Sequence, residues 1–156
     1  MFDDFTSFKN NNWNGWKTGS GTVERGVLET ERGNTYWAGL VDMGTPTQFE
    51  PAIKKVFDIE LSNKSYSVEY QFRIRTAPEL NQHFLIAVTV PRHQDFRLNT
   101  YVEHETPINQ WVDSKSGSSL FFSGSKEIWI GLWRSPGSIN PPQWAIEFDN
   151  IRVRER

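Results

Sequence analysis

Hydrophobic and polar residues alternate along most of the chain, so that every second side chain is apolar. Residues 64–76 give the clearest case, with one apolar row formed by Tyr66, Val68, Tyr70, Phe72 and Ile74. The intervening row is polar and consists of Ser67, Glu69, Gln71, Arg73 and Arg75. A period of two is typical of a β-strand that buries one face, because successive side chains of a strand point to opposite sides. No segment shows the period of roughly 3.6 residues that marks an amphipathic helix.

The same alternation predicts about ten strands, separated by Gly, Asn, Ser and Pro at intervals of roughly eight to twelve residues. The predicted strands include residues 26–31, 35–43, 52–61, 64–76, 82–90, 95–103, 120–123, 126–133 and 143–154. We expect residues 52–61 and 64–76 to pair as a hairpin, because Asn63 and Lys64 are turn-forming residues between them. Regularly spaced short strands are typical of an all-β sandwich or barrel.

Length and charge narrow the classes of function. A chain of 156 residues is most simply one domain, residues 1–156, with a substantial core. Its 17 basic and 19 acidic residues are well mixed and give a net charge of -2, which argues against a nucleic-acid partner. No apolar run approaches the ~20 residues of a membrane-spanning helix, so we expect no membrane insertion. The chain has no cysteine, and its first residues show no signal-peptide pattern.

The strand KEIWIGLW, residues 126–133, is apolar on both faces. Ile128, Ile130 and Leu132 would point to one side, and Trp129, Gly131 and Trp133 to the other. Since the aliphatic row suffices for a core, the two indoles predict an aromatic surface that binds a ligand. The alternative is that a loop covers them, either the one around Trp111 or the proline-rich residues 136–142.

The outward face of residues 95–103 carries the hydrogen-bonding side chains of Arg97, Asn99 and Tyr101. A sugar ring packs its C–H face on an indole and offers hydroxyls to amide and guanidinium groups, so these residues and the two indoles predict a saccharide site. Gln71 and Arg73 form a second set of candidate ligand-binding residues on another strand. A site at the sandwich edge is an alternative, because three further tryptophans lie in or beside predicted loops: Trp37, Trp111 and Trp144.

Three stretches carry a resemblance to a known family. The chain opens with FDDFTSF and WNGW, continues with KKVFDIELSNKSYSVEYQFRIR, and ends with WAIEFDNIRVRE. Together these resemble the calcium-containing jelly-roll carbohydrate-binding modules attached to bacterial glycoside hydrolases, over nearly the whole chain. The resemblance implies a two-sheet antiparallel β-sandwich with jelly-roll topology. It also implies an extracellular, lectin-like domain that binds a polysaccharide or cell-surface glycan without cleaving it.

The resemblance further implies one structural Ca²⁺. By position, its side-chain ligands would be Asp3, or less favourably Asp4, and Asp149, with carbonyl oxygens from the turn between Arg32 and Asn34. Ca²⁺ prefers six to eight oxygen ligands, and a shared ion would tie the two chain ends together. The alternation changes parity after Asp149, which predicts a β-bulge there.

Two other classes of function remain open at this point. A polysaccharide lyase could use Arg97, His83 and Tyr101, which lie on adjacent predicted strands. A retaining glycosidase needs two nearby carboxylates, and the chain lacks the Glu-x-Asp-x-x-Glu pattern that commonly supplies them in this fold. A structural domain of a larger assembly, such as a toxin, phage or secretion apparatus, could instead use the aromatic face to dock another protein.

Overall fold

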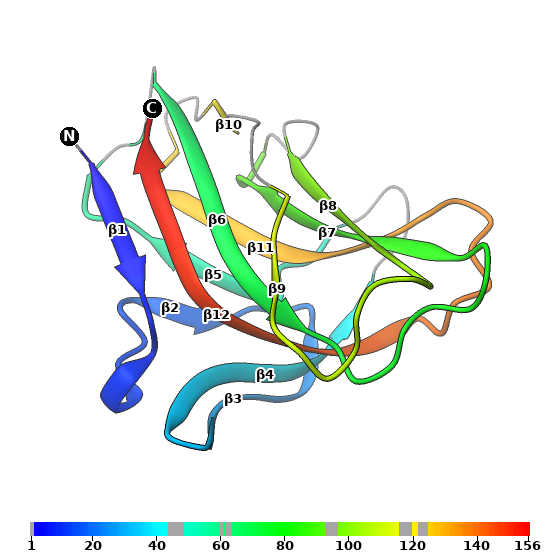
Figure 1. The fold of residues 1–156 in the computed structure, drawn as a ribbon. Helices are drawn as coiled ribbons and strands as arrows, with labels where there is room; N and C mark the ends of the chain where they lie inside the picture. The colour runs from blue at the N-terminus through cyan, green and yellow to red at the C-terminus, as the bar shows by residue number, and fades with distance from the viewer. Residues whose placement is uncertain are drawn as a thin grey trace.

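Two antiparallel sheets pack face to face in the computed structural model, with one sheet in front of the other in Figure 1. The structure describes residues 2–43, 49–59, 61, 64–92, 97–115, 120–121 and 125–156. This architecture confirms the predicted all-β sandwich of jelly-roll type. In the described residues, no helix has the length and apolar character needed to span a bilayer.

The seven-stranded sheet runs in the order β10-β6-β12-β4-β3, with β1 on the free part of β12 and β9 on β6. Its strands are β1 (Asp3–Thr6), β3 (Thr22–Glu31), β4 (Asn34–Asp42), β6 (Ser65–Arg73), β9 (Val112–Asp113), β10 (Leu120–Phe121) and β12 (Gln143–Glu155). The five-stranded sheet runs in the order β2-β5-β11-β7-β8. Its strands are β2 (Trp16–Thr18), β5 (Ile53–Val56), β7 (His83–Thr89), β8 (Leu98–Glu103) and β11 (Glu127–Arg134). A short 3-10 turn, Lys9–Asn11, links β1 to β2.

The core lies between the sheets and is built from the apolar rows that the sequence predicts. On β6 the row from Tyr66 to Ile74 is buried, and on β11 so are Ile128, Ile130 and Leu132. The Trp37 ring stacks on Phe148 with 5.6 Å between ring centroids. Trp37 and Trp144 therefore face the core from strands, which argues against the alternative of an edge site formed by these two residues.

The predicted hairpin between residues 52–61 and 64–76 is also wrong. Strand β5 pairs with β2 and β11, whereas β6 pairs with β12 in the other sheet. Successive strands of a jelly roll cross between sheets, so sequence neighbours need not pair. Lys55 on β5 points between the sheets, where its Nζ lies 2.9 and 3.0 Å from the two carboxylate oxygens of Asp4.

The predicted bulge in β12 is present. Asp149 pairs with Gln71, but the next registered pair on the same two strands is Arg152 with Glu69, so β12 contains one extra residue. Asn150 takes up the irregularity with a left-handed backbone angle φ of 49°. As a result, Asn150 reaches the outer face of the seven-stranded sheet, where its amide bonds to Gln71.

Candidate functional site

The outer face of the five-stranded sheet carries the two indoles of β11. Trp129 and Trp133 point away from the core, opposite the buried aliphatic row of the same strand. Across the sheet, Trp133 pairs with Leu85 of β7, which pairs with Tyr101 of β8. Gly131, Ala87 and Asn99 form the next row in the same way. The structure thus brings five predicted ligand-binding residues onto one face: Arg97, Asn99, Tyr101, Trp129 and Trp133.

Phe49 completes this face and was not predicted. Its ring lies against both indoles, with centroid distances of 6.3 Å to Trp129 and 5.4 Å to Trp133 and interplanar angles of 25° and 20°. Phe49 reaches the sheet above Gly131, where a Cβ atom would lie only 2.8 Å from the Phe49 ring. A glycine between two outward tryptophans was therefore the signal in the sequence that another segment crosses the strand there.

The two indoles are neither fully open nor sealed. Both indoles keep part of their surface exposed, whereas only 3% of the surface of Phe49 is exposed. The loop around Trp111, one of the two suggested covers, lies instead against the other sheet, where Trp111 contacts Tyr36 and Arg73. Phe49 packs between the two rings, so Trp129, Phe49 and Trp133 form one aromatic row, in which the exposed parts of the two indoles are the surface that a ligand can reach.

Polar groups border the aromatic row. The Arg97 guanidinium lies over the Trp133 ring at 4.1 Å from its centroid, and Trp129 donates its Nε1–H to Glu127. The Asn99 carboxamide oxygen is buried and has no hydrogen-bond partner among the described residues. Tyr101 is the most open member, with 54% of its surface exposed. The face combines aromatic surface with amide, guanidinium and phenol groups, which suits a ligand that has both C–H faces and hydroxyls.

The second predicted set lies elsewhere. Gln71 and Arg73 are on β6, and they face outward from the seven-stranded sheet on the opposite side of the sandwich. Arg73 is only 5% exposed, because its guanidinium packs in the corner between the rings of Tyr36 and Trp111 at 4.8 and 4.6 Å. Its Nε also donates to Glu147 at 2.6 Å. These contacts make Arg73 part of the structure of the sheet rather than a free ligand-binding group.

The structure does not bring the predicted calcium ligands Asp3 and Asp149 together. The Asp3 carboxylate accepts two hydrogen bonds from the Arg152 guanidinium, at 2.9 and 2.6 Å, which lowers the pKa of Asp3. Asp149 directly precedes the bulge, and its carboxylate accepts from the Asn34 amide at 3.0 Å and from the backbone N–H of Asn150 at 2.8 Å.

Burial raises the pKa of Asp149, and the hydrogen bonds from Asn34 and Asn150 together with the charge of Arg73 offset only part of that rise. Arg32 lies in the two-residue turn between β3 and β4, and Asn34, the first residue of β4, links the end of that turn to Asp149. In the part of the chain that the structure describes, no cluster of three or more His, Asp or Glu side chains could hold a metal ion.

The residues considered for lyase chemistry are only partly assembled. The rings of His83 and Tyr101 are neighbours, with centroids 5.6 Å apart, and His83 Nε2 lies 2.8 Å from the Ser135 hydroxyl. The Arg97 guanidinium is directed instead onto Trp133. Glu147 and Asp149, whose spacing matches only the first half of the glycosidase pattern, lie on the other sheet, where they bond to Arg73 and Asn34.

No protein-family model matches the sequence, and no curated protein matches it. Solved structures do match the fold. The CBM22-1 xylan-binding domain of Paenibacillus barcinonensis Xyn10C is 12% identical with a TM-score of 0.58, over 97% of this chain and 92% of that chain. The mannan-recognising module TmCBM27 is 16% identical with a TM-score of 0.58, over 100% and 99%. A CBM28 module specific for non-crystalline cellulose is 9% identical with a TM-score of 0.58, over 96% and 92%. These carbohydrate-binding modules show the same jelly-roll sandwich.

Proposed function

We propose that this protein is a non-catalytic carbohydrate-binding module that holds a glycan on the outer face of its five-stranded sheet. The observation that carries the proposal is the aromatic row of Trp129, Phe49 and Trp133, bordered by Asn99 on β8 and by Arg97, which directly precedes β8. The fold supports it, because the modules with similar structure are described as binding xylan, mannan and non-crystalline cellulose. We therefore propose a neutral polysaccharide as the ligand and an extracellular place of action.

The geometry suggests how a sugar chain would be bound. Sugar rings would pack on Tyr101 and on the exposed parts of the two indoles, where burial of C–H surface is favourable. The Arg97 guanidinium has several N–H donors and could bond ring and hydroxyl oxygens of the same chain.

Affinity electrophoresis in gels that contain xylan, mannan or soluble cellulose derivatives tests the proposal. Retardation of the wild-type protein by at least one polysaccharide, and its loss in Trp133→Ala, is the expected result. Trp111→Ala is the matched control, because Trp111 is a partly exposed tryptophan on the opposite sheet. Equal retardation of the wild-type and Trp133→Ala proteins would remove the five-stranded face as the binding site.

The absence of catalysis is part of the proposal. His83 and Tyr101 are close enough to act together, but Arg97 is engaged with Trp133 instead of completing a charged triad with them. Incubation with a panel of polysaccharides, followed by assays for reducing ends and for unsaturated products, should show no release. Product formation that disappears in Tyr101→Phe would make the protein a lyase.

Calcium binding remains a proposal in a narrower form. Asp149 would provide the carboxylate, and Asn34 and the carbonyl of Arg32 would provide further oxygens, without Asp3. Its support is the buried Asp149 carboxylate, which contacts amide donors and would gain from a cation. The melting temperature should rise with Ca²⁺ and fall with EDTA, and Asp149→Asn should remove the difference. Identical melts of the wild-type protein with and without chelator would contradict this site.

A further inference from the structure

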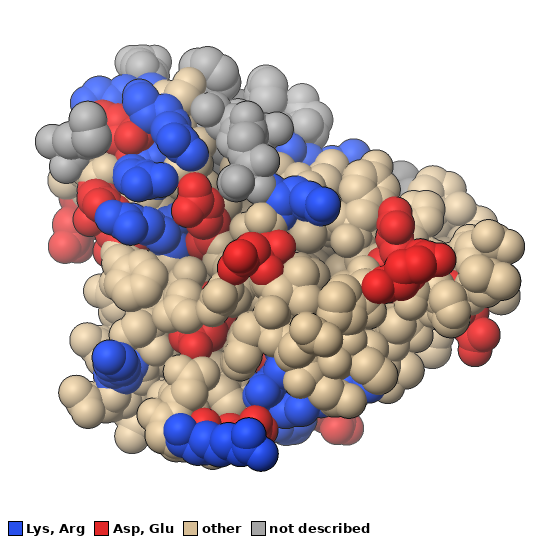
Figure 2. All heavy atoms as spheres, viewed as in Figure 1, with Lys and Arg blue, Asp and Glu red and all other residues tan. Residues whose placement is uncertain are grey.

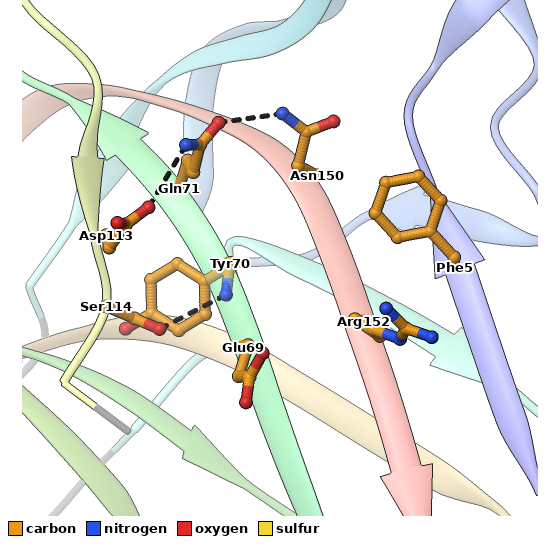
Figure 3. Close-up of a pocket in the computed structure, with 8 residues that line it drawn as sticks. All are labelled: Phe5, Glu69, Tyr70, Gln71, Asp113, Ser114, Asn150 and Arg152. Atoms are coloured by element: carbon orange, nitrogen blue, oxygen red, sulfur yellow. Dashed lines mark hydrogen bonds between the residues drawn. The ribbon is translucent and has the colours of Figure 1, made fainter.

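A groove of about 380 Å³ lies on the outer face of the seven-stranded sheet, on the side of the sandwich away from the aromatic row. Strands β6 and β12 form its floor, the segment of β9 forms one wall, and β1 forms the other, as Figure 3 shows. Its lining residues are Phe5, Glu69, Tyr70, Gln71, Asp113, Ser114, Asn150 and Arg152. A volume of this size is at the lower end of small-molecule sites, which span roughly 300–1,000 Å³.

The floor and one wall of the groove carry a fixed row of hydrogen-bonding groups. The Asn150 amide donates to the Gln71 carboxamide oxygen at 2.7 Å, and the Gln71 amide donates to Asp113 at 3.1 Å (Figure 3). Three strands thus contribute one member each, and the bulge in β12 is what brings Asn150 into the row. Because these groups already hold one another in place, a ligand that bonds to them would lose little side-chain entropy on their account.

Backbone hydrogen bonds fix the neighbouring part of the wall. The hydroxyl oxygen of Ser114 accepts from the backbone N–H of Tyr70 at 3.1 Å, and the Ser114 N–H donates to the Tyr70 carbonyl at 2.9 Å. This pair of bonds sets the position of the Ser114 side chain at the groove and leaves its O–H proton able to donate. The groove therefore offers amide, carboxylate and hydroxyl groups in defined positions.

The opposite wall is apolar. The Phe5 ring is 54% exposed, which is unusual for a phenylalanine in a sheet that buries most of its aromatic residues. Phe5 is registered with Arg152, whose guanidinium is engaged in two hydrogen bonds to Asp3. An exposed aromatic ring facing a row of planar polar groups is the combination that packs and bonds a sugar ring.

The charges at the groove favour a neutral ligand. Glu69 and Asp113 place two carboxylates in its lining, and the guanidinium of Arg152 is neutralised by Asp3. Glu69 in turn lies 3.5 Å from the guanidinium groups of Arg154 and Arg156. Figure 2 shows blue and red side chains interspersed near the chain termini on this face, without a broad area of one sign. An anionic ligand would be repelled by the Asp113 carboxylate, which bonds to the Gln71 amide rather than to a cation, whereas a polyhydroxyl compound would not be repelled.

We propose that this groove is a second saccharide-binding site, which takes one or two units of a neutral glycan between Phe5 and the row of Asn150, Gln71 and Asp113. The class of ligand rests on the proposed function, but the groove is a separate site on the opposite outer face. A single straight stretch of polysaccharide cannot contact both faces of a sandwich. Two occupied sites would therefore let one module bridge two glycan chains and raise its avidity for a dense polysaccharide surface.

The test is a titration of the isotopically labelled wild-type protein with xylohexaose, mannohexaose and cellohexaose, followed by amide NMR spectra. We expect two sets of shifted amides, one on β11 and one that includes Gln71, Ser114 and Asn150. Phe5→Ala should weaken binding at the second set by about fivefold or more and leave the β11 set unchanged. Asp113→Ala, on a different strand, should act in the same direction, and Trp133→Ala should affect only the β11 set.

Val27→Ala is the matched control, because Val27 is an exposed apolar residue on β3 of the same sheet, with 47% of its surface accessible. Shifts on β11 without shifts at Gln71, Ser114 and Asn150 would overturn the second site and leave the proposed function standing. Shifts at these three amides that persist unchanged in both Phe5→Ala and Asp113→Ala would also overturn it. If neither set responds to any of the three oligosaccharides, both the groove and the proposed function fail for these glycans.

Discussion

The ring of Phe49 lies nearly parallel to the indole of Trp133, with 5.4 Å between centroids and 20° between planes. Phe49 is far from β11 in the sequence. The contact forms because the residues before β5 cross the outer surface of β11. Packing of this kind orients the indole and removes part of its freedom before any ligand arrives. The candidate site is thus preorganised by a segment that has no strand pattern of its own.

Gly131→Ala should lower the free energy of unfolding by about 1–3 kcal/mol, because overpacking of a close contact forces its neighbours to move. The added Cβ would lie 2.7 Å from the carbonyl oxygen of Glu50 and 2.8 Å from the Phe49 ring. Urea denaturation measures the change, and Ala145→Ser, at an exposed residue of β12, is the control. Unchanged stability of Gly131→Ala would mean that residues 49 and 50 are not held against the strand.

Tyr101→Ala should weaken polysaccharide binding without affecting the fold. The ring is 54% exposed, so its removal should change the free energy of unfolding by less than about 0.5 kcal/mol. Loss of one stacking contact of about 1 kcal/mol corresponds to a roughly fivefold lower affinity. Isothermal titration calorimetry with the glycan found by affinity electrophoresis measures this. Ile108→Ala, another exposed apolar residue, should leave the affinity as it is.

Arg73→Met should destabilise the protein by about 3 kcal/mol, because it leaves the Glu147 carboxylate buried without its closest cation. Arg75, whose Nε lies 3.4 Å from Glu147, compensates for part of the loss. The double variant Arg73→Met/Glu147→Leu should recover most of the stability, since no unpaired charge remains. Chemical denaturation of the four proteins of this cycle gives the coupling. Additive losses would show that the two side chains do not act as a pair.

Asp149 and Glu31 should influence stability with opposite dependence on pH. Burial raises the pKa of Asp149 above the ordinary aspartate value of about 3.9, so its protonated form is favoured by folding. The wild-type protein should therefore gain stability relative to Asp149→Asn as the pH falls through that raised pKa. The charge of Arg73 lowers the pKa of Glu31, so the stabilisation by Glu31 is present above about pH 4.3 and is lost on further acidification.

Thermal melts between pH 7 and pH 3 measure both dependences. The difference between the wild-type protein and Glu31→Gln should be largest near neutral pH and should shrink below about pH 4.3. A difference for Asp149→Asn that stays constant over this range would show that the buried carboxyl does not titrate differently in the folded and unfolded states.

Local pattern predicted which side of β6 and of β11 faces the core, but it could not assign the partners of a strand. Ile53 is buried as expected, yet β5 pairs with Ile130 of β11 rather than with the next strand in the sequence. The short turn between residues 52–61 and 64–76 is compatible with a hairpin. Whether these two segments pair depends on the packing of all the strands into two sheets, which local sequence does not show. The bulge at Asp149 could be predicted, because the parity of the apolar residues changes there.

The alternation correctly predicted that the two indoles and Arg73 point away from the core, but it did not predict that Arg73 is buried. Arg73 does point away from the core, but the loop that carries Trp111 covers it and Glu147 pairs with it. The groove beside Phe5 depends on β1, β6, β9 and β12, which come from four distant parts of the chain. The groove could therefore not be predicted from any single segment of the sequence.

The sequence alone determined the alternating strands, the sandwich class and the outward direction of Trp129 and Trp133, because these follow from the geometry of a single strand with one apolar face. Tertiary structure decided that Gln71 and Arg73 lie on the opposite side from the indoles and that Phe49 fills the gap between them. It also decided that Asp3 bonds to Arg152 instead of joining Asp149. These outcomes depend on which distant strands become neighbours, and that is settled by the packing of the whole core.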